Sequence, residues 1–257
     1  MGIEFASIPR WAAPHLGLLW AELKADYPDF EMQPPLPSLV EQLADRPTPA
    51  PGISIEFGDP FRFRTWFVSG DKSRLLQVQD NRLIFNWRKL KPSDAYLHYR
   101  DLKPSFSREW SRFENFVIGQ RLPPLRPVQC ELTYVNHVPR GLGWSDYSDL
   151  HEAFLPWVGI SSRSLRTEGV AWNACLLLPN GLGRLHVAAQ PVMRIADGTE
   201  AFQLNLTARG APVSESQEDV LRWFDLARAA LVNAFFDMTT PAMHAIWNSE
   251  SIDARAG

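Results

Sequence analysis

The sequence predicts an α+β fold, in which a continuous antiparallel sheet carries helices on one face. Short segments with alternating apolar and polar residues follow one another in groups, separated by turn residues. Each group precedes a segment with apolar residues at helical spacing, and the same order of elements occurs in both halves of the chain. We therefore expect a single domain, residues 1–257, built of two pseudo-repeats, about 1–122 and 123–248, each a strand–helix–meander–helix unit.

The first half is expected to contain two helices and a group of strands. Apolar spacing predicts helices over 13–27, with Pro14 in a tolerated first-turn position, and over 105–119. Alternation predicts strands over 2–8, 53–57, 61–68, 74–79 and 82–89. The segment 33–52 holds six prolines, which favour an extended, polyproline-like conformation because each ring fixes φ and removes a donor.

The second half repeats this order. Strands are expected over 128–138, 169–179, 183–195 and 201–209, with a short helix over 148–158. A long helix starts near Ser214 to Ser216 and carries Phe224 on its apolar stripe, and a last short helix spans 241–247. The residues expected in the core beneath the two long helices are Phe85, Leu132, Val187 and Leu204. This topology is similar to the saddle of TATA-binding-like folds, with a helix-grip fold as the alternative.

Several segments resemble a sporadically distributed bacterial family of uncharacterised proteins. The segments are HLGLLW with the following QPPLP, LLQVQDNRLIFNWRK, VQCELTYVNHV and TTPAMHAIW, which together span most of the chain. The resemblance implies no known catalytic motif. A sporadic distribution suggests an accessory or immunity-type role in a bacterial conflict or defence system. Members begin with a longer first strand than MGIEFASI, so we expect a truncated N-terminus or a start at an internal methionine.

Composition excludes several classes of protein. The formal net charge of -3, from 26 Lys+Arg against 29 Asp+Glu, disfavours binding to polyanions through bulk charge. No stretch of about 18 residues is free of charge or proline, and no leader peptide is visible, so we expect a cytoplasmic protein without a membrane span. Cys130 and Cys175 both lie in apolar runs, which predicts buried structural thiols rather than a disulfide framework or a zinc site.

Motifs for common chemistries are missing. The sequence has no phosphate-binding loop, no dinucleotide fingerprint, no G-x-S-x-G elbow and no H-E-x-x-H zinc motif. The glycines of GLGRL at 181–185 are expected to serve a hairpin turn, and His151 is expected on a helix surface. We therefore expect no organic cofactor and no metal.

One face of the expected sheet is rich in amide, hydroxyl and imidazole side chains. In the strand 128–138, for example, Gln129 and Glu131 alternate with the apolar Cys130 and Leu132. Gln77 and Gln79 flank Val78 in the same way. Solvent exposure explains a polar face, but amides also suit a recognition groove because they donate and accept hydrogen bonds without a charge. The candidate residues for binding a ligand or partner are Asn86, Glu131, His137, Asn173, His186 and Asn205.

We expect a non-enzymatic binding protein with an unknown protein partner. Two alternatives stay open at this point. Glu131, His137 and His186 are the residues for acid–base or metal chemistry in a hydrolase-type enzyme, provided that they converge. A basic cluster around Trp87 would contact nucleic acid and consists of Arg82, Arg88, Lys89 and Lys91.

Overall fold

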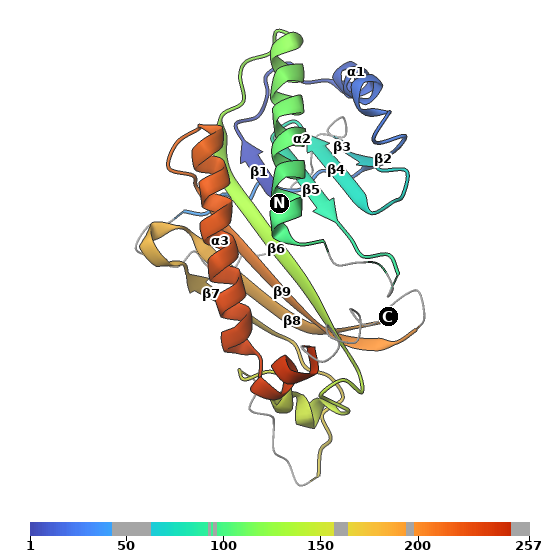
Figure 1. Cartoon of the computed structure of the whole chain (residues 1–257), viewed down its shortest axis with the longest axis vertical. Helices are drawn as coiled ribbons and strands as arrows, with labels where there is room; N and C mark the ends of the chain where they lie inside the picture. Colours follow the sequence, from blue (N-terminus) through green and yellow to red (C-terminus); the bar gives the residue numbers. More distant parts are fainter. Residues whose placement is uncertain (43–62, 92–93, 95–96, 157–163, 194–197, 248–257) are drawn as a thin grey trace. The chain divides into compact units, whose positions relative to one another are not determined.

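The computed structural model describes residues 1–42, 63–91, 94, 97–156, 164–193 and 198–247 (Figure 1). The expected strand at 53–57 and the later part of the proline-rich segment lie outside these residues. The elements in chain order are β1 (Gly2–Phe5), α1 (Ala13–Leu23), β2 (Asp29–Gln33), β3 (Arg64–Val68), β4 (Arg74–Gln79), β5 (Arg82–Trp87), α2 (Tyr99–Gly119), β6 (Pro127–Pro139), the 3-10 turn η1 (Tyr147–Glu152), β7 (Trp172–Leu177), the 3-10 turn η2 (Pro179–Gly181), β8 (Arg184–Met193), β9 (Glu200–Gly210) and α3 (Gln217–Met238). A further helix spans 241–247.

The predicted α+β class and the antiparallel sheet are confirmed. Nine strands form one sheet in the order β2-β3-β4-β5-β1-β6-β9-β8-β7. The chain forms two compact units, the first from Met1–Leu132 with Arg209–Asp225 and the second from Thr133–Ala208 with Leu226–Gly257. The single domain of two superposable pseudo-repeats and the saddle topology stay predictions.

The core of the first unit lies between the sheet and α2 (Figure 1). β1 runs between β5 and β6, where Ile3 lies directly opposite Leu83 and Cys130 on the apolar face. The ring of Phe5 lies 6.0 Å from that of Trp110 and 5.8 Å from that of Phe113, both on α2. The apolar face of this unit is therefore closed by a helix, which leaves the opposite, polar face for other contacts.

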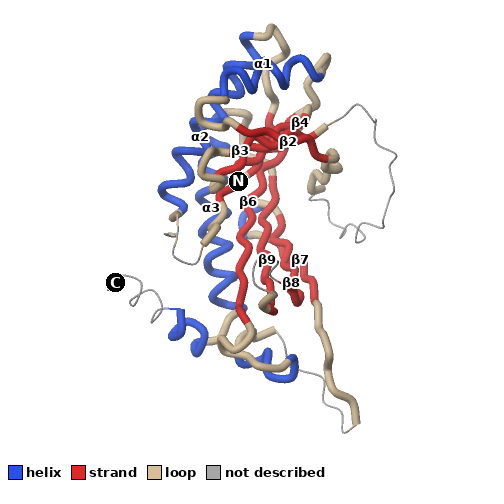
Figure 2. Tube along the Cα trace, turned by 90° about the vertical axis from the view of Figure 1, so that its right-hand side faces the viewer, coloured by secondary structure: helices blue, strands red, loops and turns tan. Residues whose placement is uncertain are grey.

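The second unit has its own aromatic core. Its strands β8 and β7 lie side by side (Figure 2) and pair antiparallel from Trp172↔Ala189 to Leu177↔Arg184. Phe202 of β9 contacts Phe154 at a centroid distance of 5.2 Å and Trp144 at 6.2 Å. All four residues expected in the core, Phe85, Leu132, Val187 and Leu204, are buried in their respective units.

Several element boundaries differ from those that periodicity predicts. The first helix ends at Leu23 rather than at residue 27, and Pro28 restricts only Tyr27, the residue directly before it. α2 begins at Tyr99, six residues before the expected start. It contains Pro104, whose missing N–H removes only the hydrogen bond to the carbonyl of Arg100. The helix expected over 148–158 is the 3-10 turn η1 in its described part.

Strand β2 was not expected from the sequence. Its residues DFEMQ are almost all exposed, so the strand has no buried face to produce a clear alternation. β2 nevertheless pairs with β3 through five consecutive residues, from Asp29↔Val68 to Gln33↔Arg64. It forms one end of the sheet, and the proline-rich segment starts directly after it.

The two cysteines differ in their surroundings. Cys130 is buried, and burial raises the pKa of its thiol above the usual range. The expectation of a second buried thiol is wrong, because Cys175 is exposed on β7. Cys175 lies opposite His186 in the pairing of β7 with β8, which places the thiol on the polar face. Among the residues that the structure describes, no helix has the length and apolarity that a membrane crossing requires.

The turn between β3 and β4 supplies a pH-dependent contribution to stability. The Asp71 carboxylate accepts hydrogen bonds from the Ser69 hydroxyl at 2.5 Å and from the Ser73 amide and hydroxyl at 3.0 and 2.8 Å. These bonds, that of Ser69 first, lower the pKa of Asp71 from 3.8 to about 2. The carboxylate is therefore more acidic in the folded state than in the unfolded state, so its stabilisation is present above pH 4 and is lost as the pH falls toward 2.

We expect Asp71→Asn to lower the free energy of unfolding by about 0.5–1 kcal/mol at pH 6, because an exposed carboxylate is screened by solvent. Urea unfolding of both proteins between pH 6 and pH 2 measures the difference. It should shrink below pH 4, and a difference that stays constant down to pH 2 would contradict this assignment.

Candidate functional site

Four polar side chains line up across the polar face of the first unit. Gln79 on β4 lies directly opposite Arg82 on β5, which lies opposite Glu4 on β1, which lies opposite Gln129 on β6. Directly opposed residues of neighbouring strands point to the same side of a sheet. We call this set the polar row. Three strand spacings of about 4.8 Å give it a length of about 14 Å.

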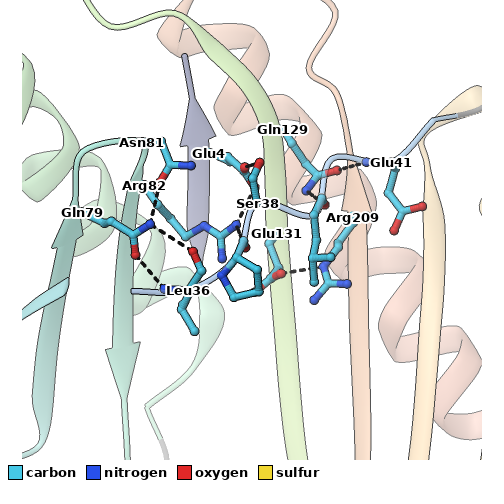
Figure 3. Close-up of polar contacts among 12 residues, drawn as sticks. Glu4, Leu36, Ser38, Glu41, Gln79, Asn81, Arg82, Gln129, Glu131 and Arg209 are labelled. Carbon is cyan, nitrogen blue, oxygen red and sulfur yellow. Dashed lines mark hydrogen bonds and ion pairs between the residues drawn. The ribbon is translucent and has the colours of Figure 1, made fainter. Parts of the chain in front are cut away.

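A segment of the same chain, Leu36–Glu41, crosses the polar row (Figure 3). We call this segment the strap. Five residue-to-residue steps of extended chain cover about 15 Å, which matches the length of the row. The strap therefore crosses four strands, and each of them contributes one side chain to it.

The two glutamines at the ends of the row bind the main chain of the strap. The Gln79 amide accepts a hydrogen bond from the N–H of Leu36 at 2.9 Å and donates one to the carbonyl of the same residue at 3.0 Å. The Gln129 amide donates to the carbonyl of Leu39 at 2.8 Å and accepts from the N–H of Glu41 at 2.7 Å. Both amides use their donor and their acceptor, so each pairs with one main-chain N–H and one main-chain carbonyl of the strap.

The two charged residues at the centre of the row bind the middle of the strap. Arg82 donates to Glu4 at 2.6 Å and to the carbonyl of Pro37 at 3.1 Å. The hydroxyl of Ser38 donates to the other carboxylate oxygen of Glu4. The side chain of Glu4 is only 4% exposed, so its charge is compensated by Arg82 and by the strap rather than by water.

The strap covers the polar groups beneath it. Gln79 and Gln129 are 4% and 3% exposed, and a further hydrogen bond from Gln79 to Asn81 at 2.9 Å orients the first of them. A buried amide without a partner would cost about 1–3 kcal/mol, so any segment that covers this row must satisfy its amides.

Docking of the strap is close to balanced in free energy. Six hydrogen bonds join Leu36–Glu41 to the row. At about 1 kcal/mol each, they contribute about 6 kcal/mol. Fixing the backbone of six residues costs about 1 kcal/mol per residue, which is of the same size. The strap is therefore held by polar contacts that another extended segment could reproduce.

A second polar network lies beside the row in the first unit. Gln77 accepts hydrogen bonds from Arg64 and from the Trp66 indole, both at 3.0 Å, and donates to Asn86 at 2.6 Å. Asn86 is thus held within the sheet face by a neighbouring amide. It does not touch the strap in the described contacts.

Glu131 lies on the same side of the row as Gln77, because Gln77, Ile84, Gly2 and Glu131 are opposed in turn across the four strands. It forms an ion pair with Arg209 at 2.6 Å. Together with Gly2, Glu4, Arg82 and Gln129 it lines a small pocket in the sheet face, next to the Glu4 carboxylate that Ser38 contacts. Two of the residues that the sequence suggested for binding, Asn86 and Glu131, therefore flank the strap site without being its main contacts.

The remaining candidates lie in the second unit. His137 Nε2 is hydrogen-bonded to Gln203 at 2.9 Å, and the buried amide oxygen of Asn205 has no hydrogen-bond partner. Asn173 lies opposite Ala188, two residues from His186, so both candidates point to the same face of the β7–β8 pair. Their convergence on one concavity stays a prediction.

Several residues of the catalytic and nucleic-acid alternatives have hydrogen-bond or ion-pair partners within the protein, and both alternatives stay untested. The Glu131 carboxylate is occupied by Arg209 and the His137 ring by Gln203. Within the described ranges, no group of three His, Cys, Asp or Glu side chains could hold a metal ion. Arg82 pairs with Glu4 and Arg88 donates to the carbonyl of Lys72 at 2.8 Å, whereas Lys89 and Lys91 are exposed.

Sequence reasoning assigned Gln79 and Gln129 to the polar face but did not single them out, and it missed Glu4 and the strap. The only signal for the strap was its proline content, which predicts an extended conformation but not a docking position. Comparisons of the chain with protein families, with curated proteins and with solved structures each found no match.

Proposed function

We propose that the first unit binds an extended polypeptide segment across its polar row and that the protein acts through this binding rather than through catalysis. The observation that carries the proposal is the pairing of Gln79 and Gln129 with both kinds of main-chain group in the strap. Four of the six contacts are made to peptide N–H and carbonyl groups by these two amides, so the row suits any segment that can extend across it.

The chemistry of the row supports binding of a neutral main chain. The charges of Glu4 and Arg82 compensate each other, and the end positions are uncharged amides. A segment can therefore satisfy the row without carrying a net charge. The accessory role in a bacterial conflict system that the family resemblance implies is compatible with such binding and remains part of the proposal.

The test uses a variant of the full chain in which residues 34–41 are replaced by eight Gly and Ser residues. The side chains that contact the strap in the described hydrogen bonds are polar and belong to the sheet, so we expect this strap-replaced variant to fold, as circular dichroism and urea unfolding will show. A fluorescent, end-capped peptide of sequence QPPLPSLVEQ should bind it with a Kd of about 0.1–1 mM by anisotropy.

Alanine at Gln79 or at Gln129 in the strap-replaced variant should weaken this binding about tenfold, since two hydrogen bonds are lost in each case. The matched control is Gln203→Ala, which removes an amide of the second unit that bonds His137 and should leave the Kd unchanged. A folded strap-replaced variant that does not bind the peptide would overturn the proposal.

A further inference from the structure

The strap is attached in an unusual way for a permanent part of a fold. Leu39 and Val40 are 41% and 46% exposed, and Pro37 and Ser38 are exposed as well. Among the apolar residues of the strap, only Leu36 is half-buried in the described structure, so the strap buries little apolar surface. Burial of apolar surface is the dominant source of stability for internal segments. It is held almost entirely by hydrogen bonds that a competing peptide could make in its place.

We infer that the strap is an intramolecular ligand that blocks the polar row in the isolated chain, and that a partner segment with a proline followed by a hydrogen-bond donor displaces it. This inference rests on the proposed function, because it assumes that the row binds peptides in trans. It adds the regulation of the site and the chemical class of the ligand.

The preference for proline follows from the contacts at Leu36 and Pro37. The row offers a donor, Arg82, to the carbonyl of Pro37. Proline has no N–H to leave unpaired. It also biases the residue before it toward an extended conformation, in which the N–H and carbonyl of Leu36 both reach Gln79.

The preference for a donor side chain follows from Glu4. Its carboxylate accepts from Arg82 with one oxygen and from the Ser38 hydroxyl with the other. A ligand with alanine at the position of Ser38 would leave one oxygen of a nearly buried carboxylate without a partner.

The first experiment compares the intact chain with the strap-replaced variant by anisotropy, using the same labelled peptide. We expect the intact chain to bind about tenfold more weakly, which corresponds to a row that is open in about one chain in ten. Equal affinities would overturn the blocking role and leave the proposed function standing. Failure of the folded strap-replaced variant to bind would instead overturn the proposed function.

A point substitution tests blocking without replacing the strap. Ser38→Ala in the intact chain removes the contact with Glu4 and should increase its affinity for the labelled peptide at least threefold. Val40→Ala, which changes an exposed side chain of the same strap, should leave the affinity unchanged. An unchanged affinity in Ser38→Ala would count against blocking.

The ligand class is tested with two altered peptides against the strap-replaced variant. Peptides with alanine in place of Ser38 or of Pro37 should each bind at least fivefold more weakly than the parent peptide. If either binds as tightly as the parent, the preference at that position is wrong.

Discussion

Replacing Phe224 by alanine is expected to lower the free energy of unfolding by about 3–5 kcal/mol, the largest effect that we expect from a single core substitution. Phe224 lies in the part of α3 that belongs to the first unit, and its side chain is fully buried. Its ring contacts Phe106 of α2 edge-on at a centroid distance of 5.0 Å and Trp223 at 5.3 Å. Alanine would leave a cavity between α2 and the start of α3.

Urea unfolding, followed by tryptophan fluorescence, measures this loss. The matched control is Leu226→Ala on the same helix, because its side chain is 53% exposed and its truncation should cost less than about 1 kcal/mol. A loss of less than about 1 kcal/mol for Phe224→Ala would show that this position is not in a packed core.

The second large effect is expected at Glu4. Glu4→Ala removes the partner of Arg82, whose side chain is only 12% exposed, and also removes the acceptor for Ser38. Leaving one charge of a buried pair uncompensated costs about 3–5 kcal/mol, and some relief is expected here because release of the strap would admit water to Arg82. We expect a loss of about 3 kcal/mol in the free energy of unfolding.

An exposed ion pair of the same unit provides the control for Glu4→Ala. Arg126 and Glu215 lie 3.1 Å apart, with side chains that are 71% and 54% exposed. Glu215→Ala should therefore cost less than about 1 kcal/mol. If the two substitutions have equal effects, Glu4 is not a buried charge that holds the row together.

Most of the fold could be predicted from the periodicity of the sequence. Alternation in segments such as 82–89 located the strands, and Phe85 and Leu132 are buried as expected because a period of two assigns each residue to a face. β2 could not be found in this way, because both of its faces are largely exposed. The family resemblance and the internal duplication stay predictions.

The site was only half predictable. Period-two alternation identified a polar face with Gln79 and Gln129, but the row depends on the pairing of β4, β5, β1 and β6, which a single sequence does not specify. The strap contacts join residues 43 and 88 positions apart, Leu36 with Gln79 and Glu41 with Gln129. Such long-range polar contacts leave no local pattern in the sequence, so glutamines that bind a peptide look the same as glutamines that face water.

The proposed function depends most on recognition of the main chain of an extended segment by the polar row. N-methylation of single peptide bonds tests this directly, because it removes one N–H donor and leaves every side chain in place. Gln79 of the row accepts a hydrogen bond from the N–H of Leu36, whereas the hydrogen bonds among the described residues include none from the N–H of Val40 to the row.

The decisive measurement is therefore the Kd of the strap-replaced variant for two forms of the peptide QPPLPSLVEQ, one N-methylated at Leu36 and one at Val40. We predict that methylation at Leu36 weakens binding about tenfold or more, as loss of a main-chain hydrogen bond and a clash with Gln79 require. Methylation at Val40 should leave the Kd within about twofold of the parent peptide, a difference of about 0.4 kcal/mol. Equal effects at the two positions would contradict main-chain recognition by the row.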